Sequence, residues 1–205
     1  MIDQYPKTGV GYNNFTYVYT ITKSGFYTFY SYSNFDIFAS TTDYYGLTFS
    51  DDNSGVYISH ASGIDWVDDC YQNRVNCTTW LPRDSGLRCN DGKMDAAGNI
   101  WISTMSISHL ENQGSIWFWD RKSSPILVID NLTIPNSIAI DNLRNRVYFA
   151  DSHEGSIYYG ELSTKGNSIT TIHEFHNSKR GVPDGSTLDS EGNLWNARWD
   201  GSALV

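Results

Sequence analysis

Three polar residues stand at the same distance before three acidic turns of the sequence. Asn90, Asn136 and Asp184 each lie five residues ahead of an aspartate, at positions 95, 141 and 189. If these segments are equivalent units of one repeat, their side chains converge near the mouth of a common axis. Amide and carboxylate oxygens suit hard cations such as calcium, magnesium or manganese, and zinc also accepts carboxylate. The spacing therefore predicts a divalent-metal site.

A simpler interpretation is that these residues serve turns. Asn90 stands in an Asn-Asp-Gly sequence and Asp184 is followed by Gly185, and such sequences favour tight turns. Each residue taken alone fits that role. The common register of all three, with Pro135 and Pro183 directly before two of them, favours the metal site.

Arg88 precedes Asn90 by two residues. On a strand, residues two apart point to the same face, so the guanidinium is expected beside the Asn90 side chain. A guanidinium in that place can hold oxygen atoms of a substrate. Taken alone, Arg88 would be interpreted as a surface charge.

The elements that must position these residues repeat along the chain. Four segments begin with an acidic turn and continue as a strand, and their first residues are 43, 46 and 48 positions apart. They are Asp52-Asn-Ser-Gly-Val-Tyr-Ile-Ser, Asp95-Ala-Ala-Gly-Asn-Ile-Trp-Ile-Ser, Asp141-Asn-Leu-Arg-Asn-Arg-Val-Tyr-Phe-Ala and Asp189-Ser-Glu-Gly-Asn-Leu-Trp-Asn-Ala. Asp, Asn and Gly tolerate turn dihedrals, whereas Val, Ile, Tyr and Trp favour strands. Each segment is therefore predicted to be a β-hairpin.

A further strand follows each hairpin. It is seen as Gly63-Ile-Asp-Trp, Gly114-Ser-Ile-Trp-Phe-Trp, Gly155-Ser-Ile-Tyr-Tyr and Gly201-Ser-Ala-Leu-Val. A repeat that holds several short strands, with no helical periodicity between them, is typical of a propeller blade. The sequence predicts an all-β fold, a β-propeller of which about four to five blades are present. A β-sandwich is the alternative, but a sandwich does not require regular spacing of similar segments.

Composition and charge exclude several classes of protein. Of the 205 residues, 15% are aromatic, and acidic residues outnumber basic ones 23 to 14, for a net charge of −9. A nucleic-acid partner is not expected, because such a partner requires a basic surface. No apolar stretch approaches the roughly 18 residues that cross a bilayer, and residues 1–7 lack a secretory signal pattern. No membrane partner is expected, and the predicted location is the cytoplasm.

The cysteines and one histidine pair are predicted to be ordinary. Cys70, Cys77 and Cys89 are an odd count without C-x-x-C spacing, which argues against a disulfide framework and a structural zinc site. His173 and His176 stand in a segment typical of strand and loop, so they are expected to be surface residues.

Most of the chain also resembles a known family. The run Arg88-Cys-Asn-Asp-Gly-Lys-Met-Asp-Ala-Ala-Gly-Asn-Ile-Trp-Ile-Ser-Thr-Met is followed by Pro135-Asn136, Phe149-Ala-Asp-Ser and Pro183-Asp184-Gly185. In this order and spacing the motifs are similar to those of the family of regucalcin (senescence marker protein), gluconolactonase and luciferin-regenerating enzyme. The similarity extends from roughly residue 46 to the C-terminus.

The resemblance implies a six-bladed propeller with one divalent metal ion at its axis and hydrolysis of sugar lactones such as gluconolactone. By motif, Asn136 and Asp184 would be metal ligands, Asp184 would also be the general base, and Arg88 with Asn90 would bind the substrate. The chemistry is coherent, because a divalent cation polarises the lactone carbonyl while a nearby carboxylate takes a proton from water. The absence of a G-x-S-x-G motif agrees with a mechanism without a covalent nucleophile.

The N-terminal part departs from the family pattern. The resemblance implies a third metal ligand, a glutamate of the first blade. Counting five residues back from Thr22, in the degenerate first turn, gives Tyr17, and residues 15–18 contain no carboxylate. Residues 1–45 are therefore interpreted as a degenerate or partial first blade, and residues 46–205 as propeller blades truncated at the C-terminus.

Three functions follow as hypotheses. The first is divalent-metal-dependent hydrolysis of a sugar lactone. The alternatives are a non-catalytic calcium-binding or interaction propeller that has lost the first-blade glutamate, and an inactive fragment. Because an incomplete propeller leaves strand edges unpaired, self-association through open blade edges is also expected.

Overall fold

The computed structural model describes residues 4–7, 16–19, 28–29, 44–49, 55–60, 62–68, 74–82, 84–177 and 179–205. Every regular element in these ranges is a β-strand, which confirms the predicted all-β class. In chain order the strands are β1 (Gln4–Lys7), β2 (Thr16–Tyr19), β3 (Thr28–Phe29), β4 (Tyr44–Phe49), β5 (Gly55–His60), β6 (Gly63–Asp68), β7 (Arg74–Thr79), β8 (Leu87–Met94), β9 (Ile100–Ser106), β10 (Gly114–Trp119), β11 (Ile126–Leu132), β12 (Pro135–Asp141), β13 (Arg146–Asp151), β14 (Ser156–Leu162), β15 (Ile169–Asn177), β16 (Val182–Leu188), β17 (Leu194–Trp199) and β18 (Ala203–Leu204).

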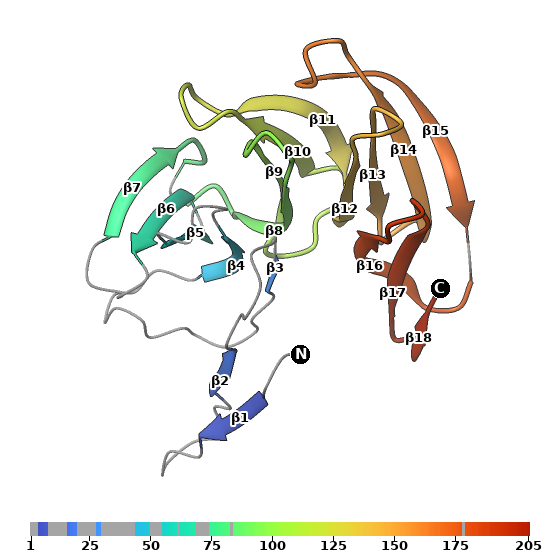
Figure 1. The fold of residues 1–205 in the computed structure, drawn as a ribbon, viewed down its shortest axis with the longest axis horizontal. Coiled ribbons are helices and arrows are strands. Elements are labelled where there is room, and N and C mark those ends of the chain that lie inside the picture. The colour runs from blue at the N-terminus through green and yellow to red at the C-terminus, as the bar shows by residue number, and fades with distance from the viewer. Residues whose placement is uncertain are drawn as a thin grey trace.

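The strands form successive antiparallel sheets in which neighbours in sequence are neighbours in space. Strands β8 to β11 and β12 to β15 make two four-stranded sheets, β16 to β18 make a three-stranded sheet, and β3 to β7 make a five-stranded sheet. Figure 1 shows the sheets arranged as an arc, with β8, β12 and β16 on its inner side and β7, β11 and β15 on its outer side. Strand β12 contacts both β8 and β16, and β8 contacts β4. The inner strands therefore line a common axis, and the predicted propeller is confirmed.

Residues 1–45, predicted to be a degenerate or partial first blade, are described only in part. The backbone of β1 pairs with that of β2, and β3 pairs with β4. The rest of this prediction lies outside the described residues.

The acidic turns join the first two strands of a blade, as the repeat predicts. In the β8–β9 turn, Asp95 Oδ1 accepts the N–H groups of Ala97 and Asn99, both at 2.9 Å. Asp189 does the same in the β16–β17 turn, where hydrogen bonds from the Trp195 indole and from Asn193 lower the pKa of its carboxyl to about 2. The aspartate of each turn therefore replaces backbone partners that the reversing chain cannot supply.

The hydrophobic core lies between blades. One cluster fills the space between the β3–β7 and β8–β11 sheets, and the next lies between the β8–β11 and β12–β15 sheets. Every residue of β9 is buried, because Ile100 and Ile102 face the preceding blade while Trp101 packs on the following one. The Trp101 and Phe118 rings meet edge to face at 5.2 Å.

The cysteines and histidines are placed as expected where they are described. Cys77 and Cys89 are free thiols, and burial raises the pKa of Cys89 to about 12. Cys70 lies outside the described residues. His173 and His176 are exposed on β15. Within the part of the chain that the structure describes, no helix has the length and hydropathy needed to cross a bilayer.

The side chain of Asp91, on β8, connects its blade to the next one through a hydrogen bond. Its buried carboxylate accepts the N–H of Ile138, on β12, through Oδ2 at 2.7 Å, and the N–H of Gly92 through Oδ1 at 2.7 Å. Strand β12 is the edge of its sheet, so the Ile138 N–H needs a partner from outside the sheet. Asp91 supplies that partner.

Replacing Asp91 with Ala is expected to lower the free energy of unfolding by about 3 kcal/mol, because two N–H groups lose an ionised acceptor and at least one of them stays buried. Urea denaturation followed by circular dichroism measures this change. The matched control is Asp130→Ala, an exposed carboxylate of β11, for which a change within about 0.5 kcal/mol is expected. Equal losses in the two variants would contradict the inter-blade role of Asp91.

Candidate functional site

The four residues singled out in the sequence lie on the inner strands of three neighbouring blades. Arg88 and Asn90 are on β8, Asn136 is on β12 and Asp184 is on β16. Because β12 contacts both of the other strands, the four residues share one region of the axis.

A break in strand pairing occurs at or directly after the candidate residue in each inner strand. The register shifts between Cys89 and Gly92 in β8, between Asn136 and Ala139 in β12, and between Pro183 and Ser186 in β16. Such β-bulges insert an unpaired residue and turn the local side chains out of the regular alternation. Asn90 and Asp184 therefore lie within the irregular segments of β8 and β16, whereas Asn136 is still paired with Ala150 and lies directly before the irregular segment of β12.

Asn136 and Asp184 are in direct contact. The Asn136 side chain donates a hydrogen bond to the Asp184 carboxylate, and its Nδ2 also lies 3.3 Å from Ser152 Oγ. Burial raises the pKa of the Asp184 carboxyl, although the hydrogen bonds from Asn136 and from the Gly185 N–H oppose that rise. The structure thus brings together the two residues predicted to hold a metal ion.

Arg88 and Asn90 form the second part of the site. Arg88 Nη1 donates to Asn90 Oδ1 at 2.9 Å and to the Cys89 carbonyl at 3.0 Å, which confirms that the two side chains share a face. Asn90 Nδ2 in turn donates to the carbonyl of Pro135 at 3.0 Å. A continuous set of hydrogen bonds therefore connects the guanidinium to the residue that precedes Asn136.

Two serines that the sequence analysis missed hold the inner strands in place. Ser152 Oγ donates to the Pro183 carbonyl while it accepts from Asn136. Ser103 Oγ donates to the Pro135 carbonyl at 2.9 Å and accepts the Asp91 N–H at 2.8 Å. A signal for Ser152 was present, since it ends the Phe149-Ala-Asp-Ser motif.

Asn196, on β17, supports the backbone beneath Asp184. Its buried Nδ2 lies within hydrogen-bonding distance of the carbonyls of Asp184 and Gly185, at 3.2 and 3.3 Å. It also lies 3.0 Å from Ser186 Oγ, which is hydrogen-bonded to Ser137 Oγ of the preceding blade. This support fixes the segment that carries the carboxylate.

The donor atoms fit a hard divalent cation. Asn136 offers an amide oxygen and Asp184 a carboxylate, the ligand types that calcium and magnesium prefer. Among the described residues no Lys or Arg forms an ion pair with Asp184, so a bound cation would offset the burial of its negative charge.

The described residues supply only part of a coordination shell. No group of three or more His, Cys, Asp or Glu side chains gathers among them. The side chain of Tyr17, at the place of the glutamate that the resemblance implies, lies outside the described part. A cation held by Asn136 and Asp184 would therefore take further oxygens from water, substrate or other residues, as magnesium commonly does.

Comparison with known proteins gives consistent matches. The profile of the SMP-30/Gluconolactonase/LRE-like region matches residues 15–205. Pentonolactonase XacC of Haloferax volcanii is 30% identical over 124 residues, which cover 60% of this chain and 42% of that protein. Regucalcin of Xenopus laevis is 26% identical over 152 residues, 70% of this chain and 50% of that protein.

The fold has matching solved structures. The calcium-binding protein regucalcin from Agrobacterium tumefaciens superimposes with a TM-score of 0.73 at 26% identity, over 82% of this chain and 57% of that one. The chain spans about half the length of the relatives it matches.

Removing the Ser152 hydroxyl tests its place in the site. The Ser152→Ala variant is expected to lose about 1–2 kcal/mol of unfolding free energy, because the buried Pro183 carbonyl and the Asn136 amide each lose a partner. Ser190→Ala, an exposed turn position between β16 and β17, is the control and should stay within about 0.5 kcal/mol of the parent chain. Thermal or urea denaturation measures both, and an unchanged Ser152→Ala variant would show that the hydroxyl is dispensable.

Proposed function

The chain belongs to the SMP-30/gluconolactonase/LRE-like family, and from that premise we propose that it hydrolyses a sugar lactone with the help of a divalent metal ion. The observation that carries the proposal is the placement of Asn136 beside Asp184 on two inner strands, β12 and β16, that contact each other. The name of the relative pentonolactonase supports a lactone as the substrate class.

Asn136 and Asp184 are the proposed metal ligands, through an amide oxygen and a carboxylate oxygen. Because Asn136 Nδ2 faces Asp184 and Ser152, the amide would turn over to present its oxygen to the cation. Calcium, magnesium, manganese and zinc all accept such donors. When bound, a divalent cation polarises a carbonyl and stabilises the negative charge that develops on its oxygen. Ser152 and Asn196 keep the two ligands in place, the first by contacting the Asn136 amide and the second by holding the Asp184 backbone.

Asp184 also acts as the general base in this proposal. Burial raises the pKa of its carboxyl, so the ionised form is a better proton acceptor than an exposed aspartate. The carboxylate takes a proton from water, whose oxygen adds to the lactone carbonyl carbon. The bond from that carbon to the ring oxygen then breaks, the ring oxygen receives the proton, and an open hydroxy acid results.

Arg88 and Asn90 orient the substrate. The bonds from Arg88 Nη1 to Asn90 Oδ1 and to the Cys89 carbonyl hold the plane of the guanidinium before any ligand arrives. Asn90 is likewise held by its bond to the Pro135 carbonyl. Groups held in advance lose little freedom on binding, so they can position sugar hydroxyls beside Asp184 at low entropic cost.

The Asp184→Ala variant tests the catalytic assignment. Lactone hydrolysis, followed by acid release from gluconolactone or a pentonolactone, is expected to fall by at least about 100-fold, because a base and a metal ligand are lost together. Asp130 lies on the outer strand β11 and not on the inner strands that carry the site, so the Asp130→Ala variant should retain the parental rate. Circular dichroism confirms that both variants are folded, and undiminished turnover in Asp184→Ala would overturn the assignment.

Metal binding is tested separately from turnover. A divalent cation at about 100 times its dissociation constant is expected to stabilise the chain by about 2.7 kcal/mol, which corresponds to a rise in Tm of about 5–10 °C. The measurement is a thermal melt with calcium, magnesium, manganese or zinc, and with chelator as the reference. In the Asn136→Ala variant the metal-induced rise in Tm should be much smaller than in the parent chain. A Tm that no cation changes would contradict the metal site.

A non-catalytic calcium-binding propeller is the second candidate. Two observations favour it. No three His, Cys, Asp or Glu side chains gather at one place among the described residues, and the similar structures include the calcium-binding protein regucalcin. A rise of Tm with calcium, without hydrolysis of any lactone offered, would identify this function. Loss of both properties would identify the third hypothesis, an inactive fragment.

A further inference from the structure

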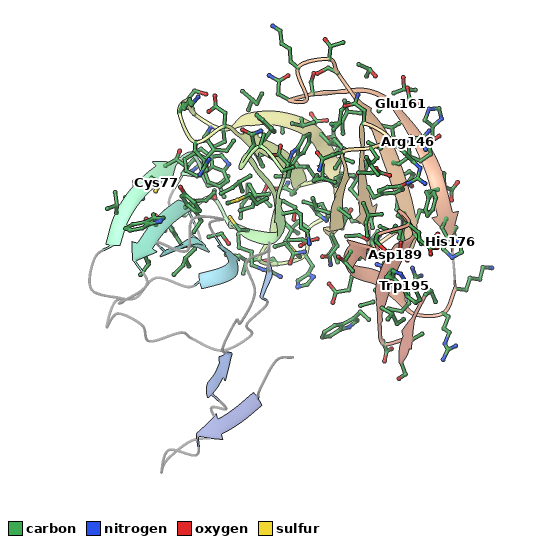
Figure 2. All side chains as sticks on the ribbon, viewed as in Figure 1. Cys77, Arg146, Glu161, His176, Asp189 and Trp195 are labelled. Carbon is green, nitrogen blue, oxygen red and sulfur yellow. The ribbon has the colours of Figure 1, made fainter. Side chains whose placement is uncertain are left out.

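A guanidinium is buried at the end of β17 that lies away from the acidic turn. Arg198 is 4% exposed and pairs with Pro183, the residue directly before Asp184. Trp195 lies near the other end of this strand, beside the turn residue Asp189 (Figure 2). A charged group is costly to bury unless it is well hydrogen-bonded, so the partners of Arg198 indicate what it is there to hold.

The irregular segment of β16 gives Asp184 a backbone without regular strand partners. The register with β17 shifts between Pro183 and Ser186, so that Asp184 and Gly185 pair with no residue of β17. Their carbonyls face the side-chain amide of Asn196 instead. Side chains of β17 therefore replace the strand ladder at the residue that carries the candidate carboxylate.

Arg198 determines which way the Asn196 amide points. Arg198 Nη1 donates to Asn196 Oδ1 at 3.2 Å. A guanidinium has only donors, so it pairs with the oxygen of an amide and not with its nitrogen. The Asn196 Nδ2 group is thereby directed toward the carbonyls of Asp184 and Gly185.

The same guanidinium holds the segment that leads into β16. Arg198 Nε donates to the Arg180 carbonyl at 3.1 Å, and Nη2 donates to the Gly181 carbonyl at 3.0 Å. Gly181 has a φ of +65°, and a side chain there would collide with the Trp199 carbonyl, so the chain passes close to β17 at this point. One planar group therefore fixes the chain before Asp184 and, through Asn196, the chain at Asp184 itself.

The preceding blade has a charged residue in the equivalent place. Asp151, on β13, is buried and pairs with Pro135, directly before Asn136. Its carboxylate accepts the N–H groups of Thr133 and Ile134, which lead into β12, at 2.7 and 3.0 Å. The entry to each strand that carries a candidate metal ligand is thus held by a buried charge of its own sheet, a carboxylate on N–H groups in one blade and a guanidinium on carbonyls in the next.

We propose that Arg198 is a positioning residue of the candidate site, which sets the place of the Asp184 carboxylate relative to Asn136. It acts through the backbone and through Asn196, without touching the substrate. The inference rests on the proposed role of Asp184 as metal ligand and base. Outer groups of this kind matter because small errors in the place of a ligand or base weaken metal binding and slow the reaction.

The Arg198→Met variant tests the proposal, because it removes the guanidinium and keeps a long side chain. Calcium affinity, measured by titration calorimetry, is expected to fall about 10- to 100-fold. For gluconolactone, kcat should fall by a similar factor while KM changes less, because Arg88 and Asn90 are left in place. Arg198→Lys should recover part of both losses, since an ammonium can still donate to some of the same oxygens.

Arg144→Met is the matched control. Arg144 Nη1 donates to Asp141 Oδ2 at 2.8 Å and lies 3.3 Å from the carbonyl of Gly192, in the turn at the far end of β16. Its loss should lower stability and leave calcium affinity and kcat at the parental values. Both variants are compared at a temperature where circular dichroism shows them folded, so that a general loss of stability is separated from positioning.

Hydrogen exchange without any metal separates this inference from the proposed function. In Arg198→Met the backbone amides of residues 182–186 should exchange at least about tenfold faster than in the parent chain, whereas Arg144→Met should leave them unchanged. If the parent chain neither binds calcium nor hydrolyses a lactone, the proposed function fails, and faster exchange in this segment still supports the positioning role. Unchanged exchange in Arg198→Met, or a loss of calcium affinity no larger than that of Arg144→Met, would overturn the proposal.

Discussion

The inner edge of each blade is the constraint on which the structure depends. Strands β12 and β16 are edge strands, so one side of each presents backbone groups that no strand of its own sheet pairs. Buried groups of this kind need partners. The preceding blade supplies them as side chains: Asp91 accepts the Ile138 N–H, and Ser152 donates to the Pro183 carbonyl. Blades are thus joined by apolar clusters between the sheets and by polar contacts at the axis.

The separation of apolar contacts between the sheets from polar contacts at the axis explains where a polar site can form. Between the sheets a polar side chain would displace the apolar contacts that hold the blades together. At the axis, polar residues are already required, and a carboxylate such as Asp184 can be half-buried because Asn136 and the Gly185 N–H donate to it. The candidate metal ligands therefore lie in a layer of the described blades where the fold already requires hydrogen-bonding groups. Asn90 shows the overlap, since it both supports Pro135 and faces Arg88.

Equivalent positions of the repeat also show that the burial of a side chain depends on the neighbouring blade and not on the residue type. Trp101 and Trp195 are the same residue type at the same register, yet one is fully buried and the other is 44% exposed. The β12–β15 sheet covers Trp101, whereas no sheet of the described residues packs on Trp195. The same logic applies to Ser152, whose hydroxyl matters because the next blade places the Pro183 carbonyl beside it.

The sequence by itself determined the strand order, the acidic turns, the common register of Asn90, Asn136 and Asp184, and the family to which the chain belongs. These features are local or periodic: Asp95 and Asp189 hold their turns through groups two and four residues away. Only the tertiary structure decided that Asn136 touches Asp184, that Ser152 supports both inner strands, and that Trp195 is exposed. Those facts depend on which side chains of neighbouring blades meet. The register of the repeat predicted that Asn136 and Asp184 converge, but it did not specify their contact, the hydrogen bonds of Ser152 or the exposure of Trp195.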